Sequence, residues 1–120
     1  MAVKLTSRQL ATLAWLETVP PRFERVKKTV ELMAILQADE VAVRGMARQL
    51  DELKAQAQGF GLNGLAEAAG IMATLARRGG GLQMRVRGLR DGLTSLRVHY
   101  DGALRLATTP EAEGGEKEGG

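Results

Sequence analysis

The chain has 120 residues, with 17 Lys and Arg against 14 Asp and Glu, a single His and no Cys. This length fits one domain, and 44% hydrophobic with 26% charged residues is typical of a soluble globular protein. The lack of Cys excludes disulfides, thiolate zinc sites, iron–sulfur clusters and Cys nucleophiles, and a single His excludes multi-His metal sites. With one Trp, one Tyr and two Phe, the composition argues against folds that stack nucleic-acid bases on exposed rings.

The sequence also predicts where the protein is located and how its C-terminal end behaves. No apolar run approaches the roughly 18 residues that span a bilayer, and residues 1–7 lack a secretory signal pattern, so we expect a cytoplasmic protein without membrane contact. Residues 108–120 are rich in Gly and Glu and have no apolar periodicity, which predicts a disordered acidic tail. Its four Glu and one Lys give −3, and because the whole chain carries +3, residues 1–107 carry +6.

The helices begin and end at recognisable signals. A short first helix is expected to follow a cap at Thr6 or Ser7, and Pro20 and Pro21 then interrupt it, because proline is tolerated only at a helix boundary or in the first turn. Asp39 is expected to cap a third helix. Glycines at 59 and 61 end that helix, and glycines at 79, 80 and 81 end a fourth.

Apolar residues at intervals of three and four predict the buried side of each helix. In chain order these are Leu10, Leu13 and Leu16; Phe23, Val26, Val30 and Met33; Val43, Met46, Leu50, Leu53, Ala57 and Phe60; Leu65, Ala68, Met72 and Leu75; and Leu82, Val86, Leu89, Leu93, Leu96, Tyr100 and Ala103. Short connections place consecutive helices antiparallel. Residues 1–107 are therefore predicted to form an all-α, antiparallel up-and-down four-helix bundle with a short extra N-terminal helix.

Residues 51–65 read D-E-L-K-A-Q-A-Q-G-F-G-L-N-G-L. This stretch resembles the signature of histidine-phosphotransfer (HPt) domains, with matches at Leu53, Lys54, Phe60, Gly61 and Leu62, and at position 65. Residues 15–23, W-L-E-T-V-P-P-R-F, are similar to the lead-in segment of that family. The resemblance covers about residues 7–107. It implies a four-helix bundle that relays phosphoryl groups to the receiver domains of response regulators.

Two departures from the family pattern change what the resemblance implies for function. Asp51 stands at the position of the phospho-accepting His, and Ala55 stands at the position of a Gly. The relay needs an imidazole nitrogen that attacks the phosphoryl group, and no His lies within residues 1–98. A carboxylate acceptor would need bound Mg²⁺ and an acidic cluster, whereas Asp51 has only Glu52 beside it. We therefore predict a chain that is not an enzyme, with no catalytic residue, metal site or cofactor.

What the motif retains is a docking face. Asp51, Lys54, Ala55 and Gln58 fall at i, i+3, i+4 and i+7, on the side of the helix opposite its apolar stripe. The resemblance implies that this face meets a receiver domain or a histidine kinase. Ala55 permits close approach, but the carboxylate of Asp51 disfavours an acidic receiver pocket unless a metal or a basic residue intervenes. The alternative is an ordinary solvated helix face, with the function elsewhere on the molecule.

Two other functions stay open. The chain could be a helical adaptor or oligomerisation domain, since Gly88 and Gly92 share a face that would admit another helix, within the chain or across a dimer. Residues 77–105 hold seven Arg and two Asp, a local charge of +5 that would attract nucleic acid or another acidic partner. No nucleic-acid-binding motif accompanies these arginines, so nucleic acid is the less favoured partner. His99 is expected at the edge of the apolar stripe or in solvent.

Overall fold

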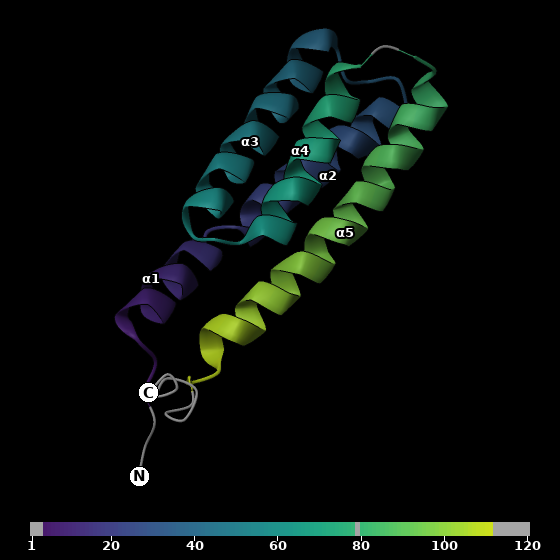
Figure 1. The fold of residues 1–120 in the computed structure, drawn as a ribbon. Helices are drawn as coiled ribbons and strands as arrows, with labels where there is room; N and C mark the ends of the chain where they lie inside the picture. Colours follow the sequence, from purple (N-terminus) through teal and green to yellow (C-terminus); the bar gives the residue numbers. More distant parts are fainter. Residues whose placement is uncertain (1–3, 79, 112–120) are drawn as a thin grey trace.

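The computed structural model describes residues 4–78 and 80–111, and these residues form helices and connecting segments without strands (Figure 1). The helices are α1 (Ser7–Leu16), α2 (Pro20–Ala34), α3 (Glu40–Gly59), α4 (Asn63–Arg77) and α5 (Leu82–Thr108). The predicted all-α class is therefore confirmed for this part of the chain. Thr108, assigned to the tail in the sequence, is the last residue of α5, and residues 112–120 of the predicted tail lie outside the described residues.

The predicted helix boundaries follow the expected local chemistry. Thr6 caps α1 through a capping box with Gln9, in which each side chain binds the backbone N–H of the other residue. Asp39 caps α3, where its carboxylate accepts a hydrogen bond of 2.8 Å from the backbone N–H of Ala42. Pro20 is the first residue of α2, a position whose N–H has no partner within the helix. Side-chain caps and proline placement thus fix where three of the helices begin.

The four longer helices lie side by side around one apolar core, and α4 lies between α3 and α5 (Figure 1). The most extensive helix pair is α3 with α4, and α1 packs against the C-terminal part of α5. The apolar stripe of α2 is buried throughout, and Phe60 after α3 is half-buried and stacks on Trp15, with ring centres 5.2 Å apart. On α5 the stripe is buried except at Leu82 and Leu93, which are half-buried.

The buried side of α1 differs from the prediction. Leu16 is fully buried as expected, but Leu10 is 54% exposed, and Gln9 is buried instead. The side-chain amide of Gln9 donates to the carbonyl oxygens of Leu106 at 3.0 Å and Thr109 at 2.6 Å, where α5 ends. Carbonyls in the last turn of a helix have no partner within it, so a buried amide stabilises this contact better than a leucine would. Apolar spacing carries no information on such a polar contact.

Gly88 and Gly92 make room for α4 within the chain. A Cβ atom added at Gly92 would lie 2.4 Å from Cγ of Met72, and one at Gly88 would lie 3.0 Å from Cδ1 of Leu75. Both distances are shorter than ordinary van der Waals contact, and Met72 is fully buried. Of the two possibilities left open by the sequence, the structure shows the intramolecular one.

Three arginines of the basic last helix make contacts within the chain. Arg90 donates to both carboxylate oxygens of Glu31 on α2, at 2.9 and 2.6 Å. Arg85 donates to a backbone carbonyl of α4 at 2.6 Å. The guanidinium of Arg97 lies 5.6 Å from the centre of the Phe23 ring. These side chains hold α5 against α2 and α4, so they do not form a continuous free basic surface.

Replacement of Gly92 by Ala should destabilise the fold by about 1–3 kcal/mol, because the new methyl group overlaps the buried Met72 side chain. The matched control is Gly102→Ala in the same helix, where an added Cβ meets nothing within 4 Å. The control should stabilise the fold by about 0.5–1 kcal/mol, because Ala favours helix over Gly. Urea unfolding followed by circular dichroism measures both changes. Equal stabilities for the two variants would show that α4 does not approach α5 this closely.

The hydrogen bond from Arg90 lowers the pKa of the Glu31 carboxyl below its ordinary value of 4.5. A carboxyl with a lowered pKa in the folded state stabilises the fold above its unfolded pKa and loses that contribution as the pH falls through the folded value. We expect the Glu31 midpoint, followed by NMR of its carboxyl carbon, to rise in Arg90→Gln. In Arg87→Gln, which removes an exposed cation one turn away, it should stay unchanged. The same midpoint in all three proteins would exclude the ion pair.

Candidate functional site

The four residues of the predicted docking face lie on α3, and three of them, Asp51, Lys54 and Gln58, border α4. Ala55 and Gln58 are exposed, whereas Asp51 and Lys54 are half-buried. Lys54 and Gln58 line a groove of about 470 Å³ whose other wall is the start and middle of α4. The wall residues are Asn63, Ala66, Glu67, Gly70, Ile71 and Thr74. The predicted face is therefore shared with a second helix, which the spacing on α3 alone did not indicate.

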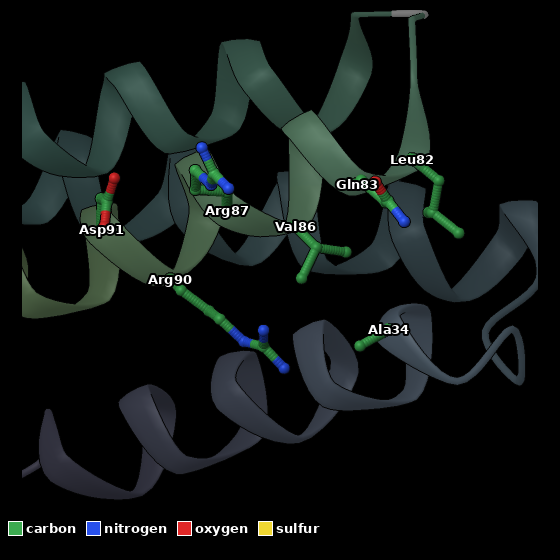
Figure 2. Close-up of a pocket in the computed structure, with 7 residues that line it drawn as sticks. All are labelled: Ala34, Leu82, Gln83, Val86, Arg87, Arg90 and Asp91. Carbon is green, nitrogen blue, oxygen red and sulfur yellow. The ribbon is translucent and has the colours of Figure 1, made fainter.

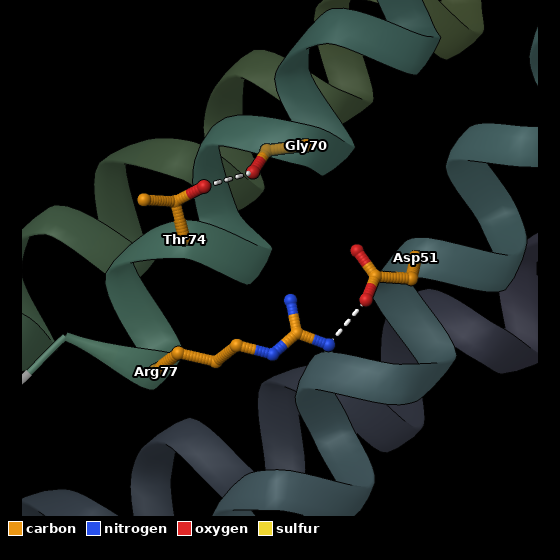
Figure 3. Close-up of polar contacts among 4 residues, drawn as sticks. All are labelled: Asp51, Gly70, Thr74 and Arg77. Carbon is orange, nitrogen blue, oxygen red and sulfur yellow. Dashed lines mark hydrogen bonds and ion pairs between the residues drawn. The ribbon is translucent and has the colours of Figure 1, made fainter.

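Asp51 is paired with a cation from the same chain. Nη2 of Arg77, the last residue of α4, donates a hydrogen bond to Oδ2 of Asp51, and the two side chains form an ion pair (Figure 3). This hydrogen bond raises the pKa of Arg77 above its ordinary value. The side chains of Arg77 and Asp51 are 47% and 46% exposed, so the pair contributes little to stability. Its main consequence is electrostatic, because it compensates the charge at position 51.

Lys54 lies across α4 at a glycine. A Cβ atom added at Gly70 would lie 3.2 Å from Cδ of Lys54 and 3.4 Å from its Nζ. Thr74 is one turn further along α4, and its hydroxyl donates to the Gly70 carbonyl at 3.1 Å (Figure 3). The absence of a side chain at position 70 thus leaves space in the groove for the stem and charge of Lys54.

Two further arginines extend this face toward the start of α3. Arg44 and Arg48 are one turn apart, and together with Val41 and Arg77 they line a hollow of about 260 Å³. Arg44, Arg48 and Asp51 continue the spacing of four and three that selects Ala55 and Gln58. Arg44 and Arg48 therefore lie on the same side of α3 as the docking face, although the HPt-like motif begins only at position 51.

A second hollow lies between α2 and α5. It has a volume of about 380 Å³, with Ala34, Leu82 and Val86 as its apolar lining (Figure 2). Figure 2 shows the side chain of Arg90 extending from α5 toward α2, and its guanidinium is bound to Glu31. Of the two arginines that line this hollow, Arg87 and Arg90, the second is therefore already paired.

The remaining candidates are the single histidine and possible metal-binding groups. His99 is exposed on α5, as expected, and lines a separate groove between α5 and the start of α4. Within residues 4–78 and 80–111, no three His, Asp or Glu side chains lie close enough together to hold a metal ion. None of the helices in that part of the chain has both the length and the apolar character needed to cross a membrane.

Comparison with known proteins adds no relative to these observations. No family model matches the chain, and the comparisons with curated proteins and with solved structures found no match. The functional interpretation therefore rests on the residues and geometry of the α3–α4 face.

Proposed function

We propose that this chain is an HPt-like docking module that does not relay phosphate. In this proposal α2, α3, α4 and α5 form an antiparallel up-and-down four-helix bundle, and α1 is an additional N-terminal helix. The α3–α4 face binds the receiver domain of a response regulator, or a histidine kinase. The observation that carries the proposal is the ion pair between Asp51 and Arg77.

The ion pair reduces the electrostatic repulsion that Asp51 would otherwise cause in docking. The phospho-accepting pocket of a receiver is acidic, so a free carboxylate at position 51 would repel it. Arg77 provides the basic residue that such a contact requires. Arg44, Arg48 and Lys54 add positive charge to the same side of α3. The acidic residues nearby are Asp51, which is paired with Arg77, and Glu67, which lines the groove from α4. This balance supports an acidic partner surface.

The same ion pair disfavours phosphoryl transfer through Asp51. A nucleophile must present an electron pair to the phosphorus atom, and the hydrogen bond from Arg77 engages one oxygen of the Asp51 carboxylate. A face that keeps charge complementarity but has a poor nucleophile suits binding better than relay.

The arginine contacts of α5 with α2 and α4, in turn, leave the nucleic-acid alternative without a specific observation in its favour.

Substitution of both Lys54 and Gln58 by Ala should weaken receiver binding by about tenfold, because both side chains line the docking groove. The matched control is Arg87→Ala, which removes an exposed cation from α5 and should leave the affinity unchanged. Calorimetry with purified receiver domains from the same genome measures the affinities. Binding that survives the α3 double variant but is lost in Arg87→Ala would place the partner on α5 and contradict the proposal.

Replacement of Asp51 by His, together with Ala55→Gly, should create a phosphoryl acceptor. The new imidazole nitrogen would attack the phosphorus of the acyl phosphate on a docked receiver, forming an N–P bond as the P–O bond to the receiver carboxylate breaks. Radiolabelled receiver would then transfer acid-labile label to the variant.

The matched control for this gain of activity is Glu52→His with the same Ala55→Gly change. Its imidazole is displaced by about 100° around the helix and should remain unlabelled. Label on the Glu52 variant alone would show that position 51 does not face the receiver. Label on the unmodified chain would contradict a module that does not relay phosphate.

A further inference from the structure

The hollow at the start of α3 gathers cations from two helices. Arg44 and Arg48 come from α3, and Arg77 comes from the end of α4; the fourth lining residue is Val41. In the described part of the chain the ion pairs are those of Arg77 with Asp51 and Arg90 with Glu31, so neither Arg44 nor Arg48 is paired with a carboxylate there. Three arginines therefore line the hollow, and one of them, Arg77, is paired with the Asp51 carboxylate beside it.

This arrangement suits a phosphoryl group better than a carboxylate. A guanidinium is planar and has five N–H donors, which can bind phosphate oxygens in pairs. In Arg77, one of the guanidinium nitrogens already donates to Asp51. The three arginines that line the hollow, less the Asp51 carboxylate paired with Arg77, give an excess of two positive charges, and Glu40 and Glu52 lie one turn from Arg44 and Arg48 on α3. A phosphoryl monoester or acyl phosphate carries about −1.5 to −2 charges near neutral pH, which matches this excess.

The hollow also lies next to the position where the docking face would meet a phosphorylation site. Arg48 is one turn before Asp51 on the same side of α3, and Arg77 contacts both the hollow and Asp51. A receiver whose phosphorylated carboxyl approaches position 51 would thus bring its phosphoryl oxygens within reach of these guanidinium groups. Asp51 cannot take the phosphoryl group readily, but its neighbours can bind it.

We infer that Arg44, Arg48 and Arg77 form a binding site for a phosphoryl dianion, and that the module therefore docks a phosphorylated receiver more tightly than an unphosphorylated one. The choice of partner rests on the proposed function, whereas the anion site rests on the arginine geometry alone. Phosphorylation of the receiver would then control when the module is occupied.

The test compares the affinity for a receiver with and without beryllofluoride, which mimics the acyl phosphate on the receiver carboxyl. Beryllofluoride should tighten binding to the natural chain by about tenfold. The double variant Arg44→Gln with Arg48→Gln should lose this enhancement, so that its affinities for the loaded and the unloaded receiver agree within about twofold. Arg25→Gln with Arg87→Gln, which removes two exposed cations from α2 and α5, is the matched control and should keep the enhancement.

The outcomes separate the two proposals. Equal binding of loaded and unloaded receiver to the natural chain overturns the inference and leaves the docking function intact. If no receiver binds in either state, the docking function fails, and titration of the chain with inorganic phosphate decides the anion site. Shifts of the arginine side-chain NMR signals that disappear in the Arg44/Arg48 variant support the site, and unchanged signals overturn it. Tighter binding of a DNA duplex through the same arginines would also overturn the inference, in favour of a nucleic-acid backbone.

Discussion

The small side chains of α4 determine how closely the neighbouring helices approach, and the rest of the structure depends on this packing. The buried surface of α4 consists largely of alanines, at positions 66, 68, 69, 73 and 76. On the α5 side, a β-carbon at Gly92 would overlap Met72, and one at Gly88 would lie only 3.0 Å from Leu75. On the α3 side, Gly70 provides the space in which Lys54 lies. A larger residue at any of these contacts would force neighbouring side chains or helices apart, because protein interiors are close-packed.

This packing connects the core to the candidate site. Since α3 and α4 have the most extensive contact, the end of α4 is held where Arg77 reaches Asp51. The ion pair is exposed and contributes little to folding, but it changes what the surface can bind. Within the described residues it compensates the charge of Asp51 beside Arg44 and Arg48, which form no ion pair there. The proposed loss of relay follows from the missing imidazole at position 51, and the ion pair supports the proposed retention of docking.

Much of the fold could be predicted from local signals. Thr6, Asp39 and Pro20 determine helix starts through contacts within a few residues, and the stripes of α2 and α5 follow from spacing. On α1 the prediction was wrong for Leu10, which is exposed, because Gln9 is buried instead and binds the end of α5, about 100 residues away along the chain. The candidate site could likewise be predicted only in part. Spacing groups the docking residues of α3, but Arg77 lies 26 residues from Asp51, and only tertiary packing brings them together.

The central claim is that the α3–α4 face is the docking surface. Titration of the isotopically labelled chain with a purified receiver domain, followed by backbone amide NMR shifts, tests it most directly. The account predicts that the largest shifts fall on Asp51, Lys54, Ala55 and Gln58 and on the facing part of α4 around Gly70. Shifts confined to the hollow between α2 and α5, or no shifts with any receiver, would contradict it.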